Sequence, residues 1–129
     1  MEVTLTVHRA KMTHNTEMNS AMDPFSQIIY KDQILKTKML RNKGKTPVWN
    51  ETFKFVVDSP SDDIKIQVLD ADLKKDDLVG ERTLKVKQLG GSNVWHELFY
   101  VYKDKDRKAG EIQISTSLPE PGEQTNAKD

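Results

Sequence analysis

Residues 64–80 read IKIQVLDADLKKDDLVG and join a strand-like run to an acidic loop. The first five residues alternate apolar and polar side chains, a period of two that is typical of a strand with one buried face. Four carboxylates follow within eight residues: Asp70, Asp72, Asp76 and Asp77. Because Asp70 and Asp72 leave the strand on the same side of the backbone, we expect acidic side chains to converge where this strand ends.

A cluster of carboxylates favours a cation, because like charges repel each other unless a positive charge lies between them. Ca²⁺ accepts about six to eight oxygen ligands in a flexible geometry, so it suits an acidic loop. Solvated turn acids are an equally good interpretation of this stretch alone. An EF-hand loop counted from Asp70 is excluded, because Lys74 takes a ligand position, Lys75 takes the glycine position and the flanking runs have strand period.

The composition predicts one polar domain. The chain has 129 residues, enough for one sizeable core, and its 20 basic and 20 acidic side chains cancel, so any electrostatic function depends on local patches. The absence of cysteine excludes disulfides, thiolate metal sites and cysteine nucleophiles, and it favours a reducing, cytoplasmic compartment. No apolar run reaches membrane-spanning length, and the N-terminus alternates like a strand rather than a signal peptide.

Alternation along the chain predicts eight strands, without a long helical pattern: residues 2–10, 25–30, 34–40, 49–57, 64–68, 82–88, 94–102 and 110–118. Short strands at regular spacing favour an all-β fold, and we expect an eight-stranded antiparallel β-sandwich. This domain covers residues 1–118. The polar tail, residues 119–129, has no periodicity and is expected to be disordered.

The sequence does not favour an enzyme. His8, His14 and His96 lie far apart with no metal-ligand spacing, and there is neither a glycine-rich phosphate loop nor a GxSxG motif. His96 follows Trp95 on a predicted strand and is expected to be a structural surface residue. Nucleic acid is not an expected partner either, because the net charge is zero and no aromatic platform lies near the basic residues.

Four short motifs, in this order and at these intervals, resemble those of a C2 domain: Asp23–Phe25, Thr46–Glu51, Leu69–Asp72 and Asp77–Gly80. The resemblance covers roughly residues 1–118. The segment Gly110–Ile114 comes last, which resembles the circularly permuted type II topology of small stand-alone C2 proteins.

The resemblance implies Ca²⁺ as the cofactor, bound by two acids in a first loop and three in a third loop. By position these are Glu17 and Asp23, then Asp70, Asp72 and Asp77, with Asp76 as a further ligand. The family usually has aspartate where Glu17 stands, so we expect weaker binding on that side.

The resemblance also implies reversible, Ca²⁺-dependent binding to anionic phospholipid membranes by a monomeric recruiter or adaptor, with phosphatidylserine and phosphoinositides as lipids. The expected apolar loop tips are Met18, Met22 and Leu73, flanked by Lys74 and Lys75. Packing within the loops is an equal alternative for the two methionines. A basic cluster resembles the family's lysine-rich, phosphoinositide-binding patch: Lys36, Lys38, Arg41, Lys43 and Lys45.

Two alternatives remain open. The basic cluster is also what a charged sheet edge needs to prevent aggregation. The whole domain could instead be a Ca²⁺-independent protein-interaction module on the same scaffold, with a protein partner in place of the membrane.

Overall fold

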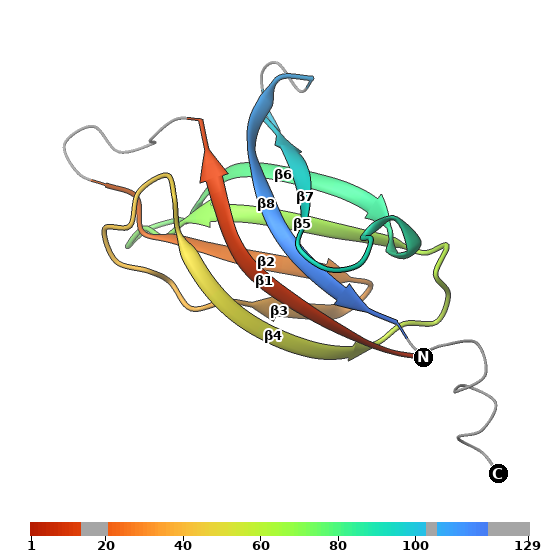
Figure 1. Cartoon of the computed structure of the whole chain (residues 1–129). Coiled ribbons are helices and arrows are strands. Elements are labelled where there is room, and N and C mark those ends of the chain that lie inside the picture. Colours follow the sequence, from red (N-terminus) through yellow and green to blue (C-terminus); the bar gives the residue numbers. More distant parts are fainter. Residues whose placement is uncertain (14–20, 103–105, 119–129) are drawn as a thin grey trace, which may run out of the picture.

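The computed structural model of the chain describes residues 1–13, 21–102 and 106–118. These residues form eight strands and one short 3₁₀ helix (Figure 1): β1 (Glu2–Met12), β2 (Pro24–Tyr30), β3 (Gln33–Lys36), β4 (Val48–Val56), β5 (Asp63–Asp70), β6 (Asp77–Lys85), η1 (Val86–Gln88), β7 (Val94–Phe99) and β8 (Lys108–Ser117). The predicted disordered tail, residues 119–129, lies outside the described residues.

The strands pair antiparallel in the order β3-β2-β5-β6-β7-β8-β1-β4. Between β6 and β7 the register holds one pair, Glu81 with Phe99, whereas the other neighbours pair over several residues. The sheet is therefore two four-stranded layers joined at one seam, and in Figure 1 β1, β4 and β8 cross over β2, β5 and β6. The predicted antiparallel sandwich is confirmed, and the last strand, β8, lies between β7 and β1 as the type II expectation requires.

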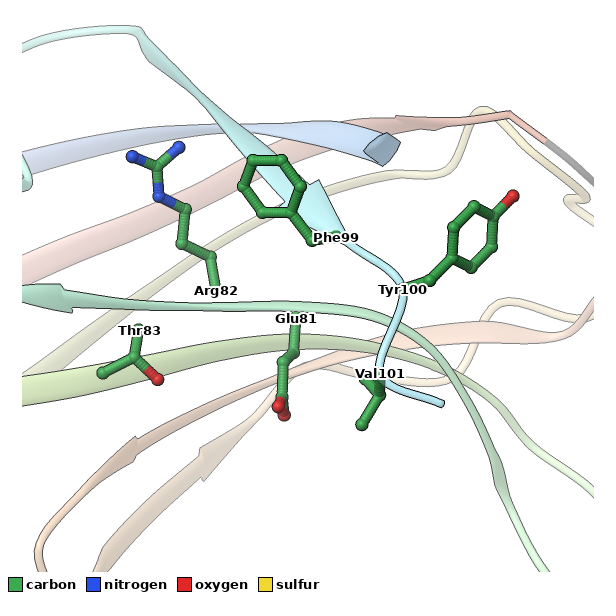
Figure 2. Close-up of a pocket in the computed structure, with 6 residues that line it drawn as sticks. All are labelled: Glu81, Arg82, Thr83, Phe99, Tyr100 and Val101. Atoms are coloured by element: carbon green, nitrogen blue, oxygen red, sulfur yellow. The ribbon is translucent and has the colours of Figure 1, made fainter. Parts of the chain in front are cut away.

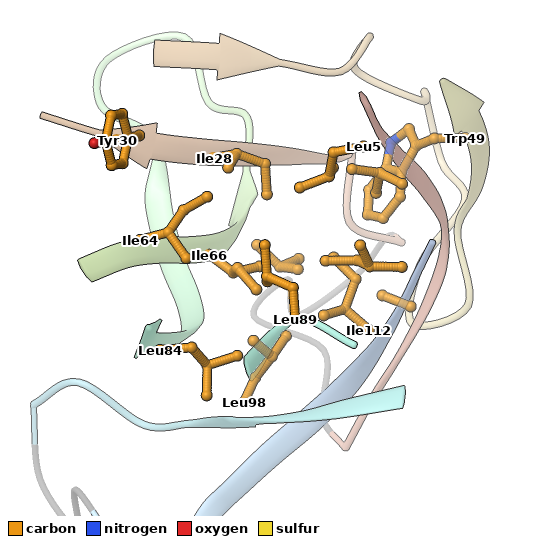
Figure 3. Close-up of a cluster of buried hydrophobic side chains, with 14 of the residues drawn as sticks. Leu5, Ile28, Tyr30, Trp49, Ile64, Ile66, Leu84, Leu89, Leu98 and Ile112 are labelled. Atoms are coloured by element: carbon orange, nitrogen blue, oxygen red, sulfur yellow. The ribbon is translucent and has the colours of Figure 1, made fainter. Parts of the chain in front are cut away.

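The core lies between the two layers, where the alternating strands place their apolar faces (Figure 3). On β5 the alternation predicted the result directly, since Ile64, Ile66 and Val68 are all fully buried. Facing them are side chains of the other layer, among them Leu5, Leu98 and Ile112. Burying one such side chain contributes about 1.5–3 kcal/mol, so this interface is the main stabilising contribution to the fold.

A glycine allows β1 and β8 to approach closely near the start of β8. Gly110 pairs with Met12, and a methyl group placed on Gly110 would lie 2.5 Å from the carbonyl oxygen of Lys11 and 2.9 Å from the Met12 Cα. Both contacts are with backbone, which cannot turn aside as a flexible side chain can. The position therefore requires glycine for space.

We predict that Gly110→Ala lowers the free energy of unfolding by about 1–3 kcal/mol, the usual cost of overpacking a close contact. Gly91→Ala is the matched control, because nothing lies within 4 Å of a methyl group there. Chemical denaturation of the two variants measures the difference, and equal stability of both would show that β8 can shift away from β1 at no cost.

Tyr30 fixes the turns at one end of the sandwich. Its hydroxyl donates to Oδ2 of Asp62 and accepts from the backbone N–H of Asp58 at 2.8 Å. Lys31 pairs with Asp58 at 2.6 Å, over the same turn. The hydrogen bond from Tyr30 is the largest of the causes that lower the pKa of Asp62, so this carboxylate is stabilised in its charged form by the native fold.

Tyr30→Phe should therefore destabilise the fold at neutral pH and less so in acid. A carboxylate whose pKa is lowered by folding contributes stability above its unfolded pKa, near 4, and that contribution is lost as pH falls through the folded value. Thermal unfolding of wild type and variant between about pH 7 and pH 3 tests this. A constant difference across that range would contradict the assigned role of Asp62.

Some predicted boundaries were wrong. The strand predicted over residues 82–88 begins at Asp77 and ends at Lys85, because the hairpin after β5 closes at the pair Asp70–Asp77. The strand predicted over residues 34–40 ends at Lys36. His96 is buried rather than on the surface, since β7 turns it inward with Leu98, and its Nε2 lies 2.9 Å from the carbonyl oxygen of Leu89. Burial lowers the pKa of His96, so the ring is neutral and donates this hydrogen bond.

Candidate functional site

Three predicted acidic residues occupy neighbouring strand ends. Asp23 immediately precedes β2, Asp70 ends β5 and Asp77 begins β6. The register pairs Asp70 with Pro24 on one side and with Asp77 on the other. The backbone therefore places these three residues on adjacent strands, and the predicted convergence of their side chains stays a prediction.

Asp70 holds the first and third loops together. Its side chain is fully buried, and its Oδ1 accepts a hydrogen bond from the backbone N–H of Asp23 at 2.9 Å. The return bond runs from the N–H of Ala71 to the carbonyl oxygen of Asp23 at 3.0 Å. A charged acceptor in such a bond makes it stronger than a neutral one. Asp23 and Asp70 are therefore fixed relative to each other by side chain and backbone alike.

Asp23 extends this connection to the loop between β3 and β4. Its Oδ1 accepts from the backbone N–H of Asn42 at 2.7 Å, and Asn42 has a positive φ of 57°. Asparagine tolerates that conformation better than most residues. The sequence analysis missed Asn42, although an asparagine two residues before Gly44 in a basic loop is a turn signal that could have indicated it.

The loop from Asp72 to Asp76 is exposed beyond these fixed residues. Oδ1 of Asp76 accepts from the N–H of Asp72 at 3.2 Å, and Oδ1 of Asp72 lies 3.4 Å from the N–H of Lys74. Asp77, which follows at the start of β6, is exposed as well. The carboxylates of Asp72 and Asp76 thus accept from backbone N–H groups of their own loop.

Within residues 1–13, 21–102 and 106–118, no three acidic or histidine side chains lie close enough to hold a metal ion. Glu17 lies outside those residues. The donor set still suits Ca²⁺, because the side chains offered by the loops are carboxylates, hard oxygen ligands. Two of them, Asp23 and Asp70, are in fixed positions. Bringing the other carboxylates to the same ion would therefore require movement of the exposed loop rather than of the sheet.

The predicted lipid contacts divide into exposed and buried residues. Leu73 is completely exposed at the tip of the acidic loop, with Lys74 and Lys75 exposed beside it. Met22 is not an exposed loop tip: it is fully buried in the core, as the alternative of packing within the loops expected, and its carbonyl oxygen accepts from the N–H of Gly44 at 3.0 Å. Met18 lies outside the described residues.

The basic cluster is exposed but is not one regular strand face. Lys36 ends β3, and Thr37 turns inward, where its hydroxyl accepts from the N–H of Ser26 at 2.8 Å. Lys38 follows as an exposed residue whose N–H bonds to Glu51 at 2.7 Å, and Arg41 is exposed in the loop beyond it. Lys36 and Lys38 are thus exposed on either side of the buried Thr37, although only Lys36 belongs to a strand.

The sequence of this chain matches one known protein family. The C2 domain family matches residues 1–99, three quarters of the chain. The chain belongs to the C2 domain family. The fold expected from the sequence resemblance is therefore confirmed at the level of the family.

Similar proteins include small plant proteins of comparable length. The chain is 31% identical to the 16 kDa phloem protein 2 of Cucurbita maxima, over 95% of this chain and 96% of that protein. It is 31% identical to the elicitor-responsive protein 3 of Oryza sativa subsp. japonica, over 86% and 78%. A C2 domain of plant extended synaptotagmin 1 superposes with a TM-score of 0.76 at 24% identity, over 92% of this chain and 96% of that domain, which supports the fold.

The described part of this C2 domain contains no helix long and apolar enough to cross a membrane.

The fixed position of Asp70 leads to a test of its structural role. Asp70→Ala should lower the free energy of unfolding by roughly 1–3 kcal/mol, because the partly buried N–H of Asp23 loses its acceptor. Asp70→Asn keeps an oxygen acceptor of the same shape and should cost less. Urea denaturation compares the two, and equal losses would show that the hydrogen bond to Asp23 does not stabilise the loops.

Proposed function

We propose that this C2 domain binds Ca²⁺ with its acidic loops and thereby binds anionic phospholipid membranes, as a recruiter rather than an enzyme. The observation that supports this most is the buried carboxylate of Asp70 between the strand ends that carry Asp23 and Asp77. Burying a carboxylate among like charges is unfavourable. Binding of a cation at the same place offsets that cost.

Asp23 and Asp70 would hold the ion as the fixed ligands, with Asp72 and Asp77 brought in from the exposed loop and Glu17 and Asp76 as further oxygen donors. Bound Ca²⁺ would neutralise the acidic loops and offer coordination positions to lipid phosphate or carboxylate oxygens. The rigid pair needs little ordering on binding, whereas the loop acids lose side-chain freedom. The fixed pair therefore determines the place of the site, and the loop acids complete it.

The membrane contact would begin at Leu73. This side chain is completely exposed at the tip of the same loop, flanked by Lys74 and Lys75. An apolar tip between basic residues suits the headgroup region, where it leaves water while the lysines reach phosphate. Without a cation, the surrounding aspartates are repelled by an anionic surface. The loop thus combines a membrane anchor with an acidic barrier.

A second basic contact would act without Ca²⁺. Lys36, Lys38 and Arg41 are exposed on consecutive parts of one segment, suited to a phosphoinositide headgroup. Their contribution should depend strongly on salt, because exposed charges are screened.

The central experiment is sedimentation with phosphatidylserine vesicles, in Ca²⁺ and in chelator. Wild type should pellet with the vesicles in Ca²⁺ but not in chelator, and Asp72→Asn should abolish that pelleting. Asp72→Asn removes one loop charge on an exposed side chain, so the fold is retained and circular dichroism can confirm it. Asp32→Asn is the matched control, an exposed aspartate in the turn between β2 and β3.

Two outcomes would count against the proposal. If Asp72→Asn and Asp70→Asn both pellet like wild type, the metal ligands are wrongly assigned. If wild type pellets with vesicles in neither condition, the Ca²⁺-independent protein-interaction module becomes the better function. The spread of the described acids, with no three gathered, is the observation that favours this second candidate.

For the basic segment, we predict that the double change Lys36→Ala and Lys38→Ala weakens binding to phosphoinositide vesicles in chelator. Each basic residue near such a surface is worth about 1 kcal/mol, which corresponds to about thirtyfold for the pair at low salt. The double change Lys54→Ala and Lys87→Ala removes the same charge from exposed positions elsewhere. Equal weakening by both pairs would show that only net charge matters.

A further inference from the structure

The loop between β7 and β8 lies at the same end of the sandwich as the acidic loops. From the seam pair Glu81–Phe99, β6 runs back to its start at Asp77. Because β7 is antiparallel to β6, the chain beyond Phe99 continues in that same direction to Tyr102, and Figure 2 shows it passing Tyr100 and Val101, which line one pocket with Glu81 of β6. Tyr102 and Asp77 therefore leave the two layers at one end.

The base of this loop is fixed to the end of β1, where the first acidic loop begins. The N–H and the hydroxyl of Thr13 both donate to the carbonyl oxygen of Ala109 at 2.9 Å. Since the Thr13 hydroxyl donates there, it accepts from the hydroxyl of Tyr100, 3.0 Å away. The N–H of Tyr100 bonds to the carbonyl oxygen of Arg107 at 3.1 Å, which closes the loop. Tyr100 and Arg107 are thus held in place by the sheet.

The exposed chemistry of this loop is aromatic and basic. Tyr102 is 73% exposed to solvent. The guanidinium of Arg107 lies 5.5 Å from the ring centre of Tyr100, which is a cation–π contact. Arg107 is exposed as well, and its positive charge is attracted by an anionic surface. Tyrosine prefers the boundary between lipid and water, and arginine pairs with phosphate.

We propose that Tyr100, Tyr102 and Arg107 form a second membrane-docking surface, which enters the headgroup region of an anionic bilayer beside the loop that carries Leu73. The proposal rests on the proposed function, because it extends the same membrane-facing end. It adds the loop between β7 and β8, which is anchored through Thr13 and contains no predicted Ca²⁺ ligand, to the loops of the acidic end. Two separated anchors would fix the tilt of the domain on the membrane, whereas Leu73 alone would leave it free to turn.

A shallow groove of about 370 Å³ lies next to this surface, and Arg82, Phe99 and Tyr100 are among its lining residues (Figure 2). The guanidinium of Arg82 lies 5.7 Å from the Phe99 ring centre and 3.4 Å from the carbonyl oxygen of Glu97. Arg82 is half-buried, whereas Tyr102 and Arg107 are exposed, so the exposed loop beyond the groove, rather than the groove itself, is the surface assigned to lipid.

The absence of cysteine from the chain makes a site-specific probe straightforward. Single cysteines placed by Tyr102→Cys, Leu73→Cys and Val56→Cys would carry an environment-sensitive fluorophore. Val56 is the matched control, because it is 58% exposed at the far end of β4, paired with Glu2 at the N-terminus. The labelled proteins are mixed with vesicles of phosphatidylserine and phosphatidylcholine, in Ca²⁺ and in chelator.

In Ca²⁺, the probes at positions 102 and 73 should both shift to the blue on adding vesicles, and the probe at position 56 should not. A shift at position 73 with none at position 102 would overturn the second docking surface and leave the proposed function intact. No shift at either position would overturn both, because nothing at this end would then meet lipid.

Unlabelled variants give an independent measure. Tyr102→Ser should weaken Ca²⁺-dependent vesicle binding about fivefold, since partial transfer of one ring from water is worth roughly half of its full burial. Arg107→Gln should also weaken this vesicle binding, and the loss of affinity should be larger at low salt than at high salt. Ile34→Ser, a 56% exposed control on β3, should leave the affinity unchanged. Equal affinities for Tyr102→Ser and Ile34→Ser would contradict the proposal.

Discussion

The hydrogen bond from the Asp23 amide to the buried carboxylate of Asp70 joins the two loops on which the candidate site depends. It is possible because β2 and β5 pair so that Pro24 lies opposite Asp70. Asp23 in turn accepts a hydrogen bond from the backbone N–H of Asn42. This second bond fixes the loop between β3 and β4 to the same two strand ends. The carboxylates of Asp70 and Asp23 thus join three loops, and that of Asp70 does so from a fully buried position.

Much of this arrangement could be predicted from the sequence, because strand alternation is a local property. The pattern on β5 predicted both which side chains are buried and that Asp70 and Asp72 come at the end of the strand. The likeness of four motifs to C2 domains then implied that Asp23 and Asp77 belong to the same site as this strand end, which period alone could not supply. The family and the sandwich are confirmed; the metal ligands remain a prediction.

What the sequence could not predict depends on contacts between distant segments. Met22 and Leu73 are both apolar residues near acids, yet the first is closed over by the loop of Gly44 and the second is fully exposed. His96 looks like a surface residue by polarity, but the Leu89 carbonyl satisfies it inside the core. The bond between Thr13 and Tyr100 likewise joins residues 87 positions apart, so no local pattern indicates that the β7–β8 loop shares the acidic end.

Amide chemical-shift mapping during a Ca²⁺ titration tests the central claim most directly, because it reports both whether the ion binds and where. The cross-peaks of Asp23, Asn42 and the segment from Asp70 to Asp77 should move together. Those of Tyr30 and Asp62 should stay in place, because their turn-region contacts involve none of the candidate ligands. No movement at saturating Ca²⁺, or movement confined to residues outside the acidic loops, would contradict the account.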